Sequence, residues 1–182
     1  MIMIKKIYHK LSMLFNNNFI SLEKQARRAG VRMGENNFIS SHFWDTEPYL
    51  IKIGSNCQIT GGVRFATHGG GAAVRDRYPK FDTFGKVEIG DYVYIGFNSL
   101  IMPGVTIGNN VIVAAGSVVT KSIPNNSVVA GNPAKYICSI DDYLERNLQF
   151  NTDTKGKDAD EKRSILMILS DDKFISKSII ER

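Results

Sequence analysis

Aliphatic residues recur at every sixth position through the middle of this 182-residue chain. The register holds without a slip through six consecutive hexads, whose first positions are Ile89, Ile95, Ile101, Ile107, Val113 and Val119. A small or β-branched residue follows four places after each of them, at Val93, Ser99, Val105, Val111, Ser117 and Ile123. Neither an α-helix nor a simple β-strand sustains this period. The pattern predicts a parallel β-helix, in which three hexads make one coil and equivalent positions stack roughly 18 residues apart.

Upstream of this regular block the hexads are interrupted twice. Their first positions in this part of the chain are Met33, Ile39, Ile53, Ile59 and Phe65. The first break is the segment 42–48, and the second is a long loop at about 68–86. Because Phe65 and Ile89 are 24 residues apart, a multiple of six, the register survives the loop. Excursions that leave a repeat and return in phase are typical places for function in such architectures.

Helical patterns flank the hexads on both sides. Residues 1–29 carry apolar side chains at helical spacing, and a short second helix is expected to begin at Ser21 and end at Gly30. We interpret this segment as a cap on the open end of the β-helix, with membrane association or a lid as the alternative. After the last hexad, further helices are expected over 141–150 and 161–169.

The composition, with 43% hydrophobic and 23% charged residues, is that of a globular protein with one domain and appended helices. We therefore divide the chain into a helical cap (1–30), a β-helix domain that carries the chemistry (31–137) and a helical extension (138–182). The net charge of +5 suits a phosphate-bearing ligand. The basic residues are dispersed along the sequence, which argues against nucleic-acid binding.

Cysteine usage and hydropathy bear on the cellular location. Cys57 and Cys138 are too few for a disulfide framework or a metal site, and Cys57 falls at a buried small position of its hexad. The chain has neither the apolar core of a signal peptide nor an apolar run long enough to span a membrane. A cytoplasmic protein without an integral membrane segment is expected.

His68 is the first candidate for chemistry. It stands at the start of the long loop, and the glycines 69–71 that follow would let a substrate approach the imidazole closely. An imidazole can serve as a general base at neutral pH, although a surface histidine in a loop is the alternative. His42 either joins a pocket or packs against Trp44, and His9 is expected to be solvated. No metal is expected, because the glycines give His68 no partner ligand in sequence.

A second candidate cluster lies in the regular block. The segment 114–116 makes a corner with almost no side chains, so a thin ligand could lie against its backbone. Lys121 and Lys135 follow and are point charges suited to phosphate. The structural alternative is equally weighted, since small residues turn corners and lysines keep a surface soluble.

Three stretches of this sequence carry a family resemblance: Ile101-Met-Pro-Gly-Val-Thr-Ile-Gly-Asn-Asn, Ala115-Gly-Ser-Val-Val-Thr-Lys-Ser-Ile-Pro and Ala130-Gly-Asn-Pro-Ala-Lys. Over about residues 31–137 the chain resembles the hexapeptide-repeat acyltransferases, in the branch of sugar, maltose-type and xenobiotic O-acetyltransferases. The resemblance implies a left-handed parallel β-helix, a homotrimer and acetyl-CoA as the donor. It also implies sites between subunits, with the histidine from one copy and much of the CoA contact from its neighbour.

Matched to the motifs of this family, His68 stands at the position of the catalytic base. The positions implied for acetyl-CoA binding are Phe97, Ala115, Thr120, Lys121 and Lys135. The loop Arg75-Asp-Arg-Tyr-Pro-Lys-Phe-Asp is most similar to loops of acetyltransferases found with surface-polysaccharide synthesis. We assign acceptor binding to three of its residues, Arg75, Arg77 and Tyr78.

The resulting functional prediction is an acetyl-CoA-dependent O-acetyltransferase that acts on a hydroxyl of a sugar or polysaccharide precursor. His68 takes the hydroxyl proton, and the acceptor attacks the thioester directly. A carboxylate should orient the imidazole, and the candidates are Asp45, Glu47, Asp76 and Asp82. Two alternatives stay open: N-acetylation of an amino sugar, and a non-catalytic trimeric β-helix that serves as a binding scaffold.

Overall fold

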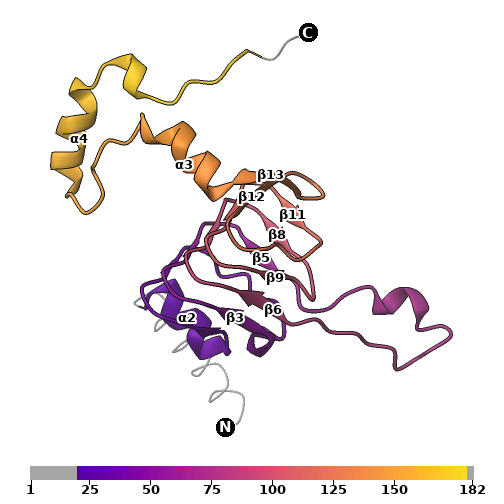
Figure 1. Cartoon of the computed structure of the whole chain (residues 1–182). Helices are drawn as coiled ribbons and strands as arrows, with labels where there is room; N and C mark the ends of the chain where they lie inside the picture. Colours follow the sequence, from indigo (N-terminus) through magenta and orange to yellow (C-terminus); the bar gives the residue numbers. More distant parts are fainter. Residues whose placement is uncertain (1–19, 180–182) are drawn as a thin grey trace. The chain divides into compact units, whose positions relative to one another are not determined.

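The computed structural model describes residues 20–179 and shows a β-helix built from three sheets (Figure 1). Sheet 1 contains β1 (Arg32–Met33), β3 (Ile51–Ile53), β6 (Val87–Ile89) and β9 (Thr106–Ile107). Sheet 2 contains β2 (Phe38–Ile39), β4 (Gln58–Ile59), β7 (Tyr94–Ile95), β10 (Ile112–Val113), β12 (Ser127–Ala130) and β13 (Lys135–Ser139). Sheet 3 contains β5 (Arg64–Phe65), β8 (Leu100–Ile101) and β11 (Val118–Val119).

The chain visits the three sheets in turn, and every strand pair within them is parallel except that of β12 and β13. In the regular block each strand pairs with the strand one coil further on. The register joins Glu88 to Thr106, Tyr94 to Ile112 and Leu100 to Val118. These offsets confirm the predicted stacking of one coil on the next.

The core of the β-helix is formed by the first and fifth positions of the hexads. All twelve of these side chains in the regular block are buried. The backbone turns with positive φ at the fourth position, as at Asn98 and Asn110, and not directly after the aliphatic residue. Glycine is needed at the second position of the hexad for a different reason, the close approach of the next coil. A Cβ on Gly96 would lie 2.4 Å from the backbone nitrogen of Ala115 in that coil.

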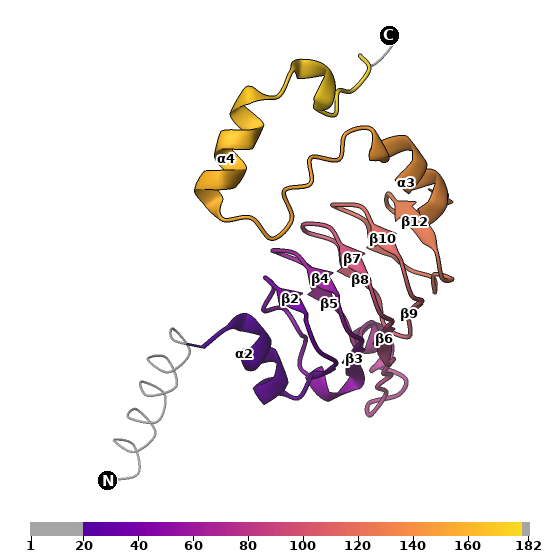
Figure 2. The ribbon, with the colours of Figure 1, turned by 60° about the vertical axis from the view of Figure 1, so that its left-hand side comes forward.

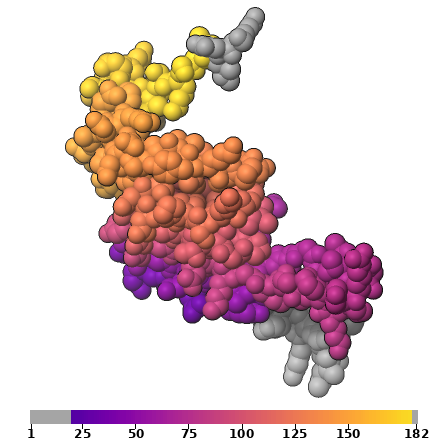
Figure 3. All heavy atoms as spheres, turned by 45° about the vertical axis from the view of Figure 1, so that its right-hand side comes forward, coloured from indigo at the N-terminus to yellow at the C-terminus, as the bar shows by residue number. Residues whose placement is uncertain are grey.

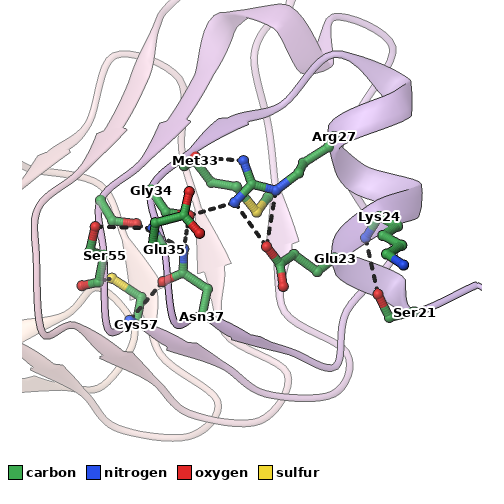
Figure 4. A network of polar contacts seen from close by, with 11 residues as sticks. Ser21, Glu23, Lys24, Arg27, Met33, Gly34, Glu35, Asn37, Ser55 and Cys57 are labelled. Carbon is green, nitrogen blue, oxygen red and sulfur yellow. Dashed lines mark hydrogen bonds and ion pairs between the residues drawn. The ribbon is translucent and has the colours of Figure 1, made fainter.

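Helix α2 (Leu22–Ala29) covers the first coil (Figure 4). The hydroxyl of Ser21 accepts a hydrogen bond from the backbone N–H of Lys24, and Gly30 ends the helix in the left-handed conformation, as predicted. The guanidinium of Arg27 donates to the carbonyl oxygens of Met33 (2.7 Å) and of the following glycine. These carbonyls belong to the first coil, so α2 supplies the partners that a preceding coil would otherwise supply. The helix expected before residue 16 lies outside the described residues.

Residues from Asp141 onward form a second compact unit. It contains most of α3 (Ile140–Leu148), and α4 (Ala159–Ile168) (Figure 2). The carboxylate of Asp158 caps the N-terminus of α4 by accepting the backbone N–H of Glu161. Both helices lie within two residues of their predicted bounds. The part of the chain that the structure describes also contains three short 3-10 helices, at Pro48–Leu50, Gly71–Val74 and Asp171–Lys173. Among the helices of residues 20–179, none is long and apolar enough to cross a membrane.

The long loop predicted at 68–86 leaves the β-helix after β5 and returns in front of β6. Figure 3 shows it in magenta, standing out from the coils as an arm. An antiparallel bridge between His68 and Phe84 closes the arm at its base. The arm therefore departs and returns at one point of the prism that the three sheets form, which is why the hexad register is unbroken across it.

Candidate active site

The two interruptions of the hexad repeat meet at His68. Glu47, from the first interruption, places its Oε2 2.8 Å from Nδ1 of the His68 ring. Oδ2 of Asp45, from the same segment, lies 3.5 Å from this nitrogen. A carboxylate on Nδ1 fixes the ring orientation and favours a proton on that nitrogen, which leaves Nε2 as the basic atom. The geometry selects Glu47 and Asp45 from the four predicted carboxylate candidates.

Thr67 and Thr46 hold the two carboxylates in place. The backbone N–H of Thr67 donates to Asp45 Oδ2 at 2.7 Å, and the N–H of Thr46 donates to Asp45 Oδ1 at 2.9 Å. The two threonine hydroxyls donate to Glu47, that of Thr67 to Oε2 and that of Thr46 to Oε1, each at 2.8 Å. The segment that carries the carboxylates is therefore bonded to the segment that carries the base.

Both carboxyl groups stay ionised at neutral pH. Hydrogen bonds from the hydroxyls of Thr46 and Thr67 hold the pKa of Glu47 below its usual value. Burial raises the pKa of Asp45, but the backbone N–H groups of Thr67 and Thr46 outweigh burial, and the net shift is downward. Two carboxylates therefore face Nδ1 of the His68 ring, Glu47 at 2.8 Å and Asp45 at 3.5 Å.

The same three side chains also form a set of potential metal ligands. One donor atom each from Asp45, Glu47 and His68 lies within 4.8 Å of the others. Sequence spacing around His68 did not indicate such a set, because the carboxylates come from another segment of the chain. The set would suit a divalent cation, yet it equally serves an imidazole base. The expectation of a site without metal stays a prediction.

A cavity of about 380 Å³ opens beside His68. Its other lining residues come from both ends of the arm and from the turn after β8, and are Gly69, Gly70, Thr83, Phe84, Gly85, Met102, Pro103 and Gly104. The ring of Phe84 lies 5.9 Å from that of His68, centroid to centroid. A Cβ on Gly69 or Gly70 would meet nothing within 4 Å, so these glycines leave the approach to the cavity open.

The residues assigned to acetyl-CoA lie at different corners of the prism. Thr120 and Lys121 follow β11 and share with His68 the corner between sheets 3 and 1, two coils further along. Phe97 and Ala115 lie at the corner between sheets 2 and 3, and both are exposed. Lys135 begins β13. A single chain therefore does not gather all of these positions around His68.

The acceptor residues predicted in the arm lie away from the His68 cavity, whose lining includes none of them. Arg77 and Tyr78 instead line a hollow of about 530 Å³ with the segment 79–81. The guanidinium of Arg75 donates to the carbonyl oxygen of Phe81 at 3.2 Å and is thus tied to the arm itself. Their assignment to acceptor binding stays a prediction.

Several residues of this site were not predicted from the sequence. Thr67 and Phe84 are the clearest, since Thr67 bonds Asp45 through its backbone N–H and Glu47 through its hydroxyl, and Phe84 packs beside the imidazole. Thr67 could have been predicted to join the site, because it is a polar residue in a hexad and directly precedes the candidate base. Phe84 gave none, because only the return of the arm brings it to His68. The ring of His42 packs on that of Phe43, with 4.1 Å between the ring centroids, whereas Trp44 stacks on Phe65.

Comparison with known proteins identifies the family. The model for bacterial transferase hexapeptide repeats (six repeats) matches residues 86–121. Protein CapG of Staphylococcus aureus is 48% identical over 149 residues, which are 80% of this chain and 87% of CapG. Galactoside O-acetyltransferase of Escherichia coli (strain K12) is 34% identical over 114 residues, 63% of this chain but only 56% of that enzyme.

Among solved structures, a hexapeptide-repeat-containing acetyltransferase of Vibrio cholerae in complex with acetyl coenzyme A superposes with a TM-score of 0.54. It is 34% identical, and the match covers 60% of each chain. The coiled fold and these matches define the class of the protein, an acyltransferase built from hexapeptide repeats. The chain belongs to the hexapeptide-repeat acetyltransferase family.

Proposed function

We propose that the protein transfers an acetyl group from acetyl-CoA to a hydroxyl of a sugar or polysaccharide precursor, with His68 as the general base. The observation that carries this proposal is the 2.8 Å contact between His68 Nδ1 and Glu47 Oε2 at the edge of an open cavity. A histidine held in this way can accept a proton at Nε2 and return it within one catalytic cycle. The likeness to galactoside O-acetyltransferase supports a sugar hydroxyl as acceptor.

The transfer proceeds in one ternary complex. The acceptor hydroxyl gives its proton to Nε2 of His68 while its oxygen attacks the thioester carbonyl carbon. The tetrahedral intermediate then collapses, the carbon–sulfur bond breaks, and the CoA thiolate takes the proton back from Nε2. The described residues that line the cavity include no Ser or Cys, which supports direct transfer over a covalent enzyme.

The active assembly in this proposal is a homotrimer of left-handed coils, with each site between two copies. The separation of Phe97 and Ala115 from the corner of His68 supports this arrangement, since a neighbouring copy would supply the missing corner. The outward positions of the sheets also differ. Those of sheet 1 are charged or polar, whereas sheets 2 and 3 carry apolar residues in their regular parts, namely Tyr94, Ile112, Leu100 and Val118. Apolar outward faces fit subunit contacts.

A mixing experiment tests the shared site. His68→Ala and Ala115→Trp each remove one half of it, so each variant alone should be inactive. Trimers reassembled from equal amounts should regain roughly a quarter of wild-type turnover, because that share of sites takes both intact halves from different copies. No recovery from mixed trimers would place the whole site within one copy.

The donor site is tested by an equilibrium titration of the protein with acetyl-CoA. We expect saturable binding that weakens at least tenfold when Lys121 and Lys135 are both changed to Ala, because each cation faces phosphate in this proposal. Lys52→Ala, on the outward face of sheet 1, is the matched control and should bind normally. Absence of binding at millimolar acetyl-CoA would remove the proposal.

The acceptor is then identified with a panel of sugar hydroxyls and amino sugars. Transfer to hydroxyls with no transfer to amines is expected, and the reverse would replace O-acetylation by N-acetylation. The predicted contacts of Arg75, Arg77 and Tyr78 with the acceptor, and a cytoplasmic location, belong to this proposal. So does the division into a cap, a β-helix and a helical extension.

A further inference from the structure

Thr67 is a buried residue whose hydrogen bonds connect the groups of the site. It directly precedes His68, its exposed fraction is 0%, and its hydroxyl lies within hydrogen-bond distance of both carboxylates. Its hydroxyl oxygen is 2.8 Å from Glu47 Oε2 and 3.1 Å from Asp45 Oδ2. A hydroxyl has a single proton, so it can donate to only one of these oxygens at a time.

The backbone decides which carboxylate receives that proton. Oδ2 of Asp45 already accepts the backbone N–H of Thr67 at 2.7 Å, a donor that does not depend on the side chain at position 67. Among the described residues, 20–179, no backbone N–H donates to Oε2 of Glu47, and this oxygen faces the Thr67 hydroxyl at the shorter distance. The hydroxyl therefore donates to Glu47, the carboxylate that contacts His68.

We propose that Thr67 is a positioning residue, whose hydroxyl holds Glu47 Oε2 against Nδ1 and thereby keeps the proton of the neutral imidazole on Nδ1. This inference deepens the proposed function and rests on it, since it concerns the same base. The Thr67 hydroxyl also lies within hydrogen-bond distance of an anionic oxygen of each carboxylate. Without it, repulsion between the carboxylates would turn Glu47 away from the ring.

The chemical consequence is a base with one defined tautomer. If Glu47 is displaced, the proton of the neutral ring distributes between Nδ1 and Nε2, and the Nε2–H form cannot accept a proton from the acceptor. Within residues 20–179, the titratable groups that face His68 are Asp45 and Glu47, while the arm contributes the uncharged ring of Phe84. The loss of the Thr67 hydroxyl therefore has no other charged group to compensate for it.

The test replaces the hydroxyl without changing the shape of the side chain. Thr67→Val removes the donor, and Thr67→Ser retains it. Thr60→Val is the matched control, because Thr60 is equally buried and its hydroxyl donates to the carbonyl oxygen of Ile95 at 2.7 Å. Thermal melting of all three variants separates loss of folding from loss of positioning.

We expect Thr67→Val to lower kcat about tenfold with an unchanged Kd for acetyl-CoA, as displacement of a general base does. Thr67→Ser should stay within about twofold of the wild type, and Thr60→Val should keep full kcat. Wild-type kcat in Thr67→Val, or an equal loss in Thr67→Ser, would overturn the proposal.

A spectroscopic measurement makes the outcome independent of activity. Nitrogen-15 NMR of the imidazole reports which ring nitrogen carries the proton, and the wild-type protein should show the Nδ1–H tautomer of His68. Thr67→Val should show a mixture of tautomers, and Thr67→Ser should not.

If these tautomers appear but no acetyl transfer is found with any acceptor, the proposed function fails and the positioning role stands. An unchanged tautomer in a folded Thr67→Val protein overturns the positioning role even if transfer is observed. Should Thr67→Val not fold, a wild-type or Thr67→Ser ring with the proton on Nε2 would overturn it.

Discussion

The β-helix has a regular half, from Val87 to Ile123, and an interrupted half that precedes it. In the regular half every hexad occupies one face and one corner, and the buried positions follow one another without exception. In the interrupted half two segments leave the prism, and they bring Glu47, Asp45 and His68 together. The regular half provides a frame with a fixed strand register. The interruptions, held by that frame, provide the candidate chemistry.

The largest expected difference between the halves is in stability. Ile101 in the regular half is 0% exposed and stacks between coils, so Ile101→Ala should lower the free energy of unfolding by about 2–5 kcal/mol. Phe81→Ala in the arm removes a larger but partly exposed side chain and should cost no more than about 0.5 kcal/mol. Urea denaturation measures both changes. Equal losses would show that the arm is part of the folding core.

A smaller effect is expected where the arm rejoins the frame. A Cβ on Gly85 would lie 2.2 Å from the backbone nitrogen of Gly104, so Gly85→Ala must move the base of the arm and, with it, Phe84. We expect about 1–3 kcal/mol of destabilisation and a several-fold loss of acetyl transfer. Gly69→Ala, whose Cβ would meet nothing within 4 Å, is the control for stability and should melt like the wild type. A Gly85→Ala protein with normal stability and activity would contradict this close contact.

The smallest effect concerns acid stability. Because the pKa values of Asp45 and Glu47 are lowered on folding, each ionised carboxylate stabilises the folded state above its ordinary pKa, 3.8 and 4.5 respectively. This stabilisation is lost as the pH falls through the lowered pKa values. The difference in unfolding free energy between the wild type and an Asp45→Asn, Glu47→Gln double variant should therefore be constant above about pH 5 and shrink below pH 4. A difference independent of pH down to pH 2 would show that neither carboxylate is bonded as an anion.

The two halves also differ in what their sequences reveal. The six-residue period predicts the strands, the buried positions and the stacking of coils, because each hexad repeats one local solution to burial and turning. Ser21 and Gly30 likewise predict the ends of α2 from local capping chemistry alone. Features that depend on local patterns of this kind can be predicted from the sequence without a structure.

The candidate site is legible only in part. His68 could be selected because it stands at the edge of the long loop, but its partners could not. Glu47 lies 21 positions earlier in the chain, and its contact with His68 depends on how the first interruption folds back onto Thr67. Asp45 also has a positive φ, a backbone conformation that the hexad pattern does not predict. The corner positions Phe97 and Ala115 show the same limit, since the family resemblance assigns them to a site that one chain does not assemble.

In our proposal, the histidine that the two interruptions place beside Glu47 is the base for acetyl transfer. The most direct measurement is the turnover of His68→Ala beside that of His42→Ala, at saturating acetyl-CoA and with the best acceptor from the panel. His42 is exposed in the first interruption, and its ring packs on that of Phe43. We predict that His68→Ala lowers kcat by roughly 10²–10⁴-fold with nearly unchanged acetyl-CoA affinity, whereas His42→Ala retains full turnover. Turnover of His68→Ala within a few-fold of the wild type, or an equal loss of turnover and acetyl-CoA affinity, would contradict the account.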